Sequence, residues 1–155
     1  MSYNPKLKAV VTQNIDGLHQ AAGSKRVLEL HGNWTRLECT GCGARSTIDD
    51  FDEARAGRVP HCPSCSAVVR PDIVFYGEAL DPATLEGAVL VIAGADMLIV
   101  GGTSLAVYPA AGLIDYYQGG RLVLMNATPT PYDGRADLII REPIGRVFAQ
   151  IQGHV

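Results

Sequence analysis

Residues 96–104 read Asp96-Met97-Leu98-Ile99-Val100-Gly101-Gly102-Thr103-Ser104, an apolar run that ends in glycines and hydroxyl side chains. A continuous apolar run of this length is typical of a strand that is buried on both faces, as in a parallel sheet. Residues 82–93 carry apolar side chains at helical spacing, and a second apolar strand is expected at residues 121–126. Strands that alternate with helices predict an α/β fold with a mostly parallel sheet covered on both faces.

Further elements are expected on both sides of this run. The expected strands cover residues 8–12, 27–30 and 137–140. The expected helices cover residues 48–56, 109–117 and 144–151. The chain has 155 residues, of which 47% are hydrophobic, enough for one buried core with a small appendage.

The composition argues against several classes of protein. A formal net charge of -3 gives no general attraction to nucleic acid or to an anionic membrane. Residues 1–8 lack the apolar segment of a signal peptide, and the longest apolar runs, residues 88–93 and 97–100, fall far short of the roughly 20 residues that span a bilayer. We therefore expect a cytoplasmic protein that binds neither membranes nor nucleic acid directly.

The four cysteines of the chain form two pairs, Cys39 with Cys42 and Cys62 with Cys65. Two residues separate the members of each pair, and 19 residues separate the pairs. This spacing is typical of a tetrahedral Zn²⁺ site, and four thiolates would leave no open position for catalysis. Two disulfides are the alternative, but the expected reducing compartment favours metal. We expect the zinc to be structural.

Polar residues follow the expected strands. In an open parallel sheet, ligands bind beyond the carboxyl ends of the strands, so these positions are candidates for a binding site. They are Gln13, Asn14, Ile15, Asp16, His31, Gly102, Thr103, Ser104 and Asn126. Amides, hydroxyls, a carboxylate and glycine N–H groups suit a ribose, a carboxamide and phosphates. Ordinary turns and helix caps use the same residues, but their shared position at one sheet edge favours a site.

Several unusual motifs occur in a fixed order along the chain. They are Thr12-Gln13-Asn14-Ile15-Asp16-Gly17-Leu18-His19, Glu29-Leu30-His31-Gly32, the four cysteines, Arg70-Pro71-Asp72-Ile73-Val74-Phe75-Tyr76-Gly77-Glu78, Gly102-Thr103-Ser104-Leu105, Pro109-Ala110-Ala111 and Asn126. In this order they resemble the sirtuins, the NAD-dependent protein-lysine deacylases. The resemblance implies an incomplete Rossmann-like NAD-binding domain at residues 1–37 and 79–155. It also implies a small zinc-ribbon domain inserted at residues 38–78.

The resemblance further implies transfer of an acyl group from lysine to ADP-ribose, with release of nicotinamide. His31 matches the catalytic histidine, and an imidazole can act as a general base near neutral pH. Asn14 and Asp16 match residues that act on the nicotinamide end of the cofactor. The implied NAD contacts are Gln13, Asn14, Ile15, Asp16, Gly102, Thr103, Ser104, Asn126 and Ile144.

Two segments would hold the acylated-lysine peptide or protein substrate. The first is Val74, Phe75, Tyr76, Gly77 and Glu78, and the second is Leu105, Ala106 and Val107. By the resemblance, both would pair with the backbone of the peptide, as in β-augmentation.

The glycine-rich Gly-Ala-Gly loop with which sirtuins ordinarily begin is absent from these 155 residues. Such a loop supplies backbone N–H groups to a pyrophosphate, so we expect weak NAD binding and slow turnover by this chain alone. In sirtuins, the strand that leads into this loop lies in the middle of the sheet. Its absence would leave strand edges that self-association or a partner chain covers.

Two other functions are alternatives to a deacylase. A non-catalytic, zinc-containing acyl-peptide or protein-binding module would bind peptides without releasing nicotinamide. A nucleic-acid-binding zinc ribbon would need a basic surface. The segment between the outer cysteines carries three arginines against four acidic residues, namely Arg45, Arg55 and Arg58 against Asp49, Asp50, Asp52 and Glu53. This balance disfavours nucleic-acid binding.

Overall fold

The structure is a computed structural model that describes residues 6–152. The chain divides into two compact units, of which the first ends at Leu85 and the second begins at Glu86. The expected α/β architecture is confirmed, because both units contain parallel strands joined through helical segments. The separate small domain expected at residues 38–78 stays a prediction.

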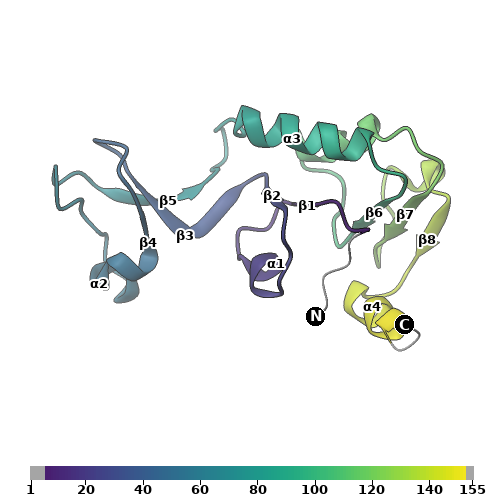
Figure 1. Cartoon of the computed structure of the whole chain (residues 1–155), viewed down its shortest axis with the longest axis horizontal. Helices are drawn as coiled ribbons and strands as arrows, with labels where there is room; N and C mark the ends of the chain where they lie inside the picture. Colours follow the sequence, from purple (N-terminus) through teal and green to yellow (C-terminus); the bar gives the residue numbers. More distant parts are fainter. Residues whose placement is uncertain (1–5, 153–155) are drawn as a thin grey trace. The chain divides into compact units, whose positions relative to one another are not determined.

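The first unit begins with a two-stranded parallel sheet. Strand β1 (Val10–Thr12) pairs with β2 (Val27–Glu29), and the short helix α1 (Leu18–Ala21) lies in the connection between them (Figure 1). The pairing continues past β2, because Leu30 N donates to Thr12 O at 2.9 Å. The residues that follow β1 and β2 are therefore side by side.

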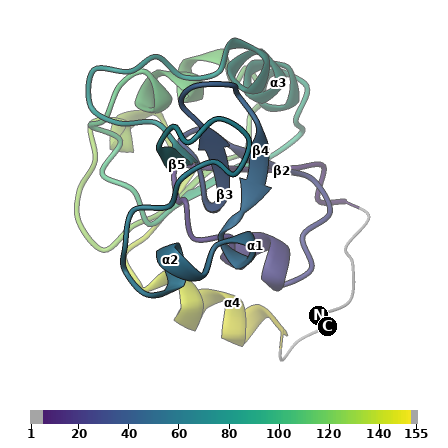
Figure 2. The same ribbon diagram turned by 90° about the vertical axis from the view of Figure 1, so that its left-hand side faces the viewer.

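An antiparallel ribbon makes up the rest of the first unit. Strand β3 (Gly32–Cys39) runs between β4 (Arg45–Thr47) and β5 (Val69–Ile73), as Figure 2 shows. Its small core contains Leu37, Cys39, Cys62 and Val69, with Ile48, Phe51 and Ala67 packed against it. Two of the four cysteines thus belong to this core. Packing of the ribbon and binding of the predicted metal therefore depend on the same residues.

The helix expected over residues 48–56 is wrong as one continuous helix. A 3-10 turn, η1 (Ile48–Asp50), and a short helix, α2 (Asp52–Arg55), stand in its place. They are separated by Phe51, whose backbone is extended with φ -131° and ψ 107°. Because Phe51 packs against the ribbon core, burial of its ring overrides the local helical preference.

Helix α3 (Pro82–Ala93) covers the predicted residues and spans the boundary between the units. Its start is capped by Asp81, whose Oδ2 accepts hydrogen bonds from Thr84 N and Thr84 Oγ1, both at 2.7 Å. No helix within residues 6–152 is long and apolar enough to cross a membrane.

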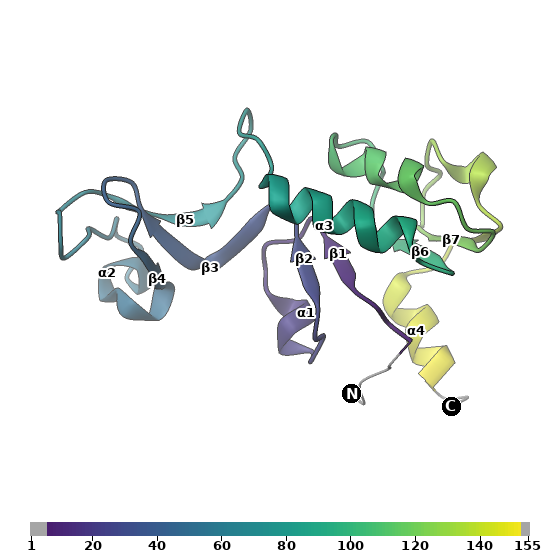
Figure 3. The same ribbon diagram turned by 45° about the horizontal axis from the view of Figure 1, so that its top comes forward.

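The second unit is built on a three-stranded parallel sheet. Strand β7 (Leu122–Met125) is buried throughout and lies between β6 (Leu98–Gly101) and β8 (Leu138–Ile140). Helix α4 (Ile144–Gln152) covers part of one face, where Val147 packs with two β7 side chains (Figure 3). Because the three strands are parallel, their carboxyl ends lie along one edge of the sheet.

The helix expected over residues 109–117 is a 3-10 helix, η2 (Ala110–Tyr116), rather than an α-helix. Over two turns the apolar spacing distinguishes the two poorly, because their periods of about 3.0 and 3.6 residues differ by less than one residue per turn. A second short 3-10 turn, η3 (Asp133–Arg135), lies between β7 and β8.

Candidate functional site

His31 lies in the turn between β2 and β3, facing the residue that follows β1. Its Nδ1 atom is 3.0 Å from the carbonyl oxygen of Gln13. A carbonyl can only accept a hydrogen bond, so Nδ1 carries the proton and Nε2 is left as the basic nitrogen. Val74 N donates to the His31 carbonyl at 3.0 Å, which links the turn to the first predicted peptide-binding segment.

The loop after Gln13 presents two predicted nicotinamide contacts, Asn14 and Asp16. Asn14 N donates to Thr12 Oγ1 at 3.0 Å, and Asp16 Oδ1 accepts from Leu18 N at 3.0 Å at the start of α1. Both residues are exposed. Local hydrogen bonds therefore shape the loop that follows β1. This loop begins directly after Gln13, whose carbonyl oxygen contacts His31.

Glu29 is a nearly buried carboxylate beside His31 that the sequence interpretation missed. Its Oε2 accepts from Arg36 Nη1 at 2.6 Å, and its Oε1 accepts from Asn33 Nδ2 at 2.7 Å. Burial opposes ionisation of Glu29, but the Arg36 guanidinium and the amides of Asn33 and Gln20 outweigh it and hold the pKa of this carboxyl below its usual range. No motif or periodicity identifies it, because the turn after β2 brings Glu29 to its partners Asn33 and Arg36.

The four cysteines converge on one point, with all their sulfur atoms within 4.8 Å of one another. Cys39 Sγ lies 3.4 Å from Cys65 Sγ, and Cys42 Sγ lies 3.7 Å from Cys62 Sγ. Four thiolates bound to tetrahedral Zn²⁺ at about 2.3 Å would be about 3.8 Å apart, so the donor set fits this metal. All four cysteines are free, which excludes the disulfide alternative in this structure.

Backbone N–H groups that face the sulfur atoms favour the thiolate form of the cysteines. Those of Cys42 and Gly41 point at Cys39 and lower the pKa of its thiol to about 6. At Cys65 the N–H of Ala67 favours the thiolate, but the Cys39 sulfur, burial and the other two cysteine sulfurs together outweigh it, and the pKa rises to about 12. Space is also tight, because a Cβ at Gly41 would lie 2.7 Å from Ala67 Cβ.

Residues 74–78 form a tight turn. Glu78 N donates to Phe75 O at 3.0 Å, and Phe75 N donates to Glu78 Oε2 at 2.9 Å. Arg70 pairs with Glu78 at 2.8 Å, and it lowers the pKa of that carboxyl to about 2, with help from the Phe75 N–H. Tyr76 projects fully into solvent, and Gly77 has φ +87°. The predicted pairing of this segment with a peptide would use backbone groups that are partly engaged here.

In the second unit, the glycines after β6 meet the start of α4. A Cβ at Gly101 would lie 2.3 Å from Ile144 Cδ1, so a larger residue here would force the end of the Ile144 side chain to shift. Gly102 has φ +67°, and its N–H donates to Met125 O at 3.0 Å. The structure thus brings Gly102 and Ile144 to the same end of the sheet, beside the last residue of β7.

The segment after Gly102 turns sharply toward η2. Thr103 Oγ1 accepts from Leu105 N at 3.2 Å, and Leu105 is buried with an unusual positive φ of 53°. Ser104, Ala106 and Val107 are exposed. Residues 105–107 form no strand in this structure, so their pairing with a peptide stays a prediction.

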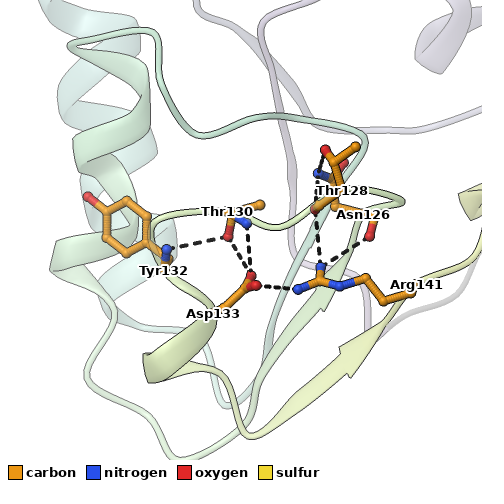
Figure 4. A network of polar contacts seen from close by, with 6 residues as sticks. All are labelled: Asn126, Thr128, Thr130, Tyr132, Asp133 and Arg141. Atoms are coloured by element: carbon orange, nitrogen blue, oxygen red, sulfur yellow. Dashed lines mark hydrogen bonds and ion pairs between the residues drawn. The ribbon is translucent and has the colours of Figure 1, made fainter.

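A polar network, shown in Figure 4, shapes the loop that begins with Asn126. Asn126 Nδ2 donates to Thr128 O at 2.9 Å. Arg141 Nη1 donates to the carbonyl oxygens of Asn126 and Thr128, both at 3.2 Å. Arg141 also pairs with Asp133, whose Oδ1 accepts from Thr130 Oγ1 at 2.8 Å. The sequence interpretation named Asn126 but missed the arginine that holds its loop.

The same loop is tied through Tyr132 to Tyr108, which directly follows the second predicted peptide-binding segment, and to Asp115 of η2. The buried Tyr132 side chain donates to Asp115 Oδ2 at 3.2 Å, and its hydroxyl lies 3.5 Å from that of Tyr108. The hydrogen bond to Tyr108 and burial raise the pKa of Tyr132 to about 12. Tyr132 therefore stays neutral and acts as a fixed link between the loops.

Each unit thus brings together part of the predicted site. The first contains Gln13 with His31, the exposed Asn14 and Asp16, and the four cysteines. The second contains Gly102, Ile144 and Asn126 at one end of its sheet.

Comparisons with known proteins agree with these observations. The Sir2 family model matches residues 1–109. An NAD-dependent protein deacetylase of Clostridium acetobutylicum is 50% identical over 146 residues, which cover 94% of this chain and 59% of the relative. The corresponding protein of Clostridium perfringens is 51% identical over 147 residues, which cover 94% of this chain and 59% of the relative. The chain therefore spans about three fifths of the length of these curated relatives.

Solved structures give the same result. A structure described as Sir2 with p53 peptide and NAD+ matches with a TM-score of 0.87 at 41% identity, over 95% of this chain and 62% of the other. A structure described as Sir2 bound to acetylated peptide matches with a TM-score of 0.87 at 40% identity, over 95% of this chain and 63% of the other. The chain belongs to the Sir2 family.

Proposed function

We propose that this chain carries the chemistry of an NAD-dependent protein-lysine deacylase, with His31 as its general base. The contact between His31 Nδ1 and Gln13 O at 3.0 Å carries this proposal. In the neutral imidazole, this contact leaves Nε2 as the nitrogen that can accept a proton from a ribose hydroxyl. The name of the Clostridium acetobutylicum relative, an NAD-dependent protein deacetylase, supports the same reaction.

NAD is the cofactor that we propose for this chain. The proposed contacts are Gln13, Asn14, Ile15 and Asp16 in the first unit, and Gly102, Thr103, Ser104, Asn126 and Ile144 in the second. When bound, NAD supplies an electrophilic ribose carbon from which nicotinamide can depart. The exposed Asp16 carboxylate can accept a hydrogen bond from the carboxamide, while the exposed Ser104 hydroxyl can donate one to a phosphate.

Zinc is the metal that we propose for the four cysteines. The sulfur separations of 3.4 and 3.7 Å are close to those of a tetrahedral thiolate site. Its role would be structural, because Cys39 and Cys62 are part of the ribbon core. Retention of four free thiols also fits the cytoplasm, where we place the protein.

The proposed substrate is an acylated lysine in a protein or peptide. Residues 74–78 and 105–107 would pair with its backbone, as β-augmentation requires. The first segment is hydrogen-bonded to the His31 turn through Val74, which would keep the substrate near the proposed base. The solved Sir2 structure with an acetylated peptide supports this substrate class.

We also propose that a second polypeptide, another copy or a separate chain, covers part of the second unit. Ile99 and Leu138 flank Val123 on neighbouring strands, yet they are 44% and 51% exposed. Such apolar positions on a sheet face are ordinarily covered. Sedimentation should therefore reveal association, and a stable, compact monomer would contradict this part of the proposal.

Nicotinamide release tests the enzymatic proposal. The full chain is incubated with NAD and an acetyl-lysine peptide, alongside His31→Ala and the matched control His61→Ala. His61 is exposed and lies in the ribbon, so its loss should leave release unchanged. We expect slow release that depends on His31. Release that is equal in His31→Ala would overturn the role of His31, and peptide binding without release would favour the non-catalytic binding module.

A further inference from the structure

His31 is the middle residue of the segment 29–33, which contains the turn between β2 and β3. A hydrogen bond between side chains joins the two ends of this segment. Asn33 Nδ2 donates to Glu29 Oε1 at 2.7 Å, which bridges the residues two before and two after His31. Both partners are nearly buried, because the Glu29 side chain is 7% exposed and Asn33 is 5% exposed. A buried hydrogen bond to a carboxylate is stronger than one between neutral groups.

The orientation of the Asn33 amide is fixed by its other bonds. Its Oδ1 atom accepts from Thr35 N at 2.9 Å and from Thr35 Oγ1 at 2.7 Å. Since the oxygen faces two donors, the amide nitrogen must face Glu29. On the far side of Glu29, Arg36 occupies the second carboxylate oxygen. The bridge therefore has only one satisfactory arrangement.

The bridged turn is joined on both sides to the segment that contains Gln13. Before His31, Leu30 N donates to Thr12 O at 2.9 Å, and after it, Trp34 N donates to Ile15 O at 3.1 Å. The Asn33 amide nitrogen would also lie 3.3 Å from a Cβ at Gly17, so it packs against the end of the same loop. These contacts place the Gln13 carbonyl opposite Nδ1 of His31.

We propose that Glu29 and Asn33 form a clamp that positions the His31 imidazole and selects its Nδ1–H tautomer. Neither side chain touches the reacting atoms, so both are positioning residues rather than catalytic ones. The inference rests on the proposed role of His31 as the base. It also assigns a function to a buried polar pair that the predicted site does not include.

The imidazole depends on this clamp because a single carbonyl holds its tautomer. His31 is only partly buried, so solvent can compete for Nδ1 if the turn loosens. Without the bridge, the backbone bonds on either side of His31 can keep the strands paired while the turn between them moves. The ring would then lose its contact with Gln13, and the two neutral tautomers would become mixed.

The test is nitrogen NMR of the histidine side chains in the full chain, above neutral pH, where an ordinary imidazole is uncharged. His31 signals are assigned by their loss in His31→Ala, and exposed His61 gives the reference for an unconstrained ring. In the unaltered chain, His31 should be mainly the Nδ1–H tautomer. In Asn33→Ala and in Glu29→Leu, which is similar in size but offers Asn33 no acceptor, the ratio of Nδ1–H to Nε2–H should fall about fivefold, the change expected from one lost hydrogen bond.

Two controls separate positioning from general stability. Asp49→Asn removes an exposed ion pair with Arg55 in the same unit and should leave the His31 tautomer unchanged. Arg36→Gln removes the outer partner of Glu29 while keeping the Asn33 bridge, so it lowers stability with a smaller tautomer change. A tautomer ratio that follows stability across all four variants would overturn the clamp.

Other outcomes are equally decisive. An unchanged His31 tautomer in folded Asn33→Ala and Glu29→Leu would overturn the proposal, as would a wild-type ring without Nδ1–H dominance. If neither variant folds while Asp49→Asn does, the pair determines folding and the positioning role is rejected. Because NMR needs no NAD, absence of nicotinamide release together with the predicted tautomer change would reject the proposed enzyme but keep the clamp.

Discussion

Each unit of the chain uses an arginine and a carboxylate to hold a loop that carries a predicted site residue, but the two pairs differ in burial. In the first unit, the Glu29 carboxylate beside His31 is 7% exposed, whereas its partner Arg36 is 47% exposed, so the difference lies in the carboxylates. In the second unit, Arg141 and Asp133 hold the Asn126 loop with side-chain exposures of 36% and 25%. The same chemistry therefore occurs in two different dielectric environments.

The difference in burial determines what each network can do. Removing one partner of a buried pair leaves an uncompensated polar group, which is costly, whereas exposed pairs contribute little to stability. We infer that the network around His31 fixes one geometry, while the network around Asn126 only biases the shape of a solvent-exposed loop.

Removal of the metal should cause the largest loss of folded structure, and this loss should be confined to the first unit. A chelator, or Cys62→Ser, removes a ligand from the ribbon core, and structural zinc sites supply folding free energy directly. We expect amide protection to be lost in β3, β4 and β5 but kept in the β6–β8 sheet, as measured by hydrogen exchange. Persistent protection of the ribbon after complete metal removal would contradict the structural role.

Glu29→Ala should have the next largest effect. It leaves Arg36 and Asn33 without their shared acceptor, and we expect a loss of about 2 kcal/mol in the free energy of unfolding. Trp34, the only tryptophan, lies in β3 and reports denaturant unfolding of this unit by fluorescence. A loss no greater than that of Asp49→Asn, which breaks an exposed pair, would contradict the importance of burial.

Arg141→Ala should have a smaller effect on stability. Its ion pair with Asp133 is partly exposed, so we expect the unfolding midpoint to fall by no more than about 4 °C. The local change should be larger, because the carbonyl oxygens of Asn126 and Thr128 lose their shared donor. Amide exchange of residues 126–133 should accelerate while that of β7 does not. A large fall in the midpoint would show that this network is as important as the buried one.

The smallest effect should come from acid titration of the exposed Glu78. Its pKa is lowered from 4.5 to about 2, chiefly by Arg70, so the folded state binds this proton less readily than the unfolded state. The stabilisation is therefore complete above pH 4.5 and is lost as the pH falls toward about 2. Stability measured over this range should fall less steeply in Glu78→Gln. If stability falls equally steeply with pH in the unaltered chain and in Glu78→Gln, Glu78 does not contribute to the acid sensitivity.

The sequence predicts the parallel part of the fold well. Leu122–Met125 is an uninterrupted apolar run and is a fully buried strand, and the helix at residues 82–93 has the expected bounds. The ribbon was harder to predict. Its strands are short and turn-rich, and Phe51 interrupts a helix because its ring joins a core that forms only in three dimensions.

The same limit applies to the site. The clustering of the four cysteines and the position of Gln13 and His31 at neighbouring strand ends could be anticipated from cysteine spacing and from where the apolar runs end, but the contact between Gln13 and His31 could not. The roles of Glu29 and Arg141 could not, because their partners are set by the turns at residues 31–32 and 126–133. Such side-chain contacts depend on the positive φ of Gly32 and on loop geometry, for which apolar periodicity gives no signal.

The most direct test of the central claim is to follow the acyl group by mass spectrometry. The full chain is supplied with NAD and a peptide whose lysine carries an isotopically labelled acetyl group, in parallel with His31→Ala and His61→Ala. We predict that the label appears on ADP-ribose, however slowly, in the unaltered chain and in His61→Ala but not in His31→Ala. Label found only as free acetate, or on ADP-ribose to the same extent without His31, would contradict the claim.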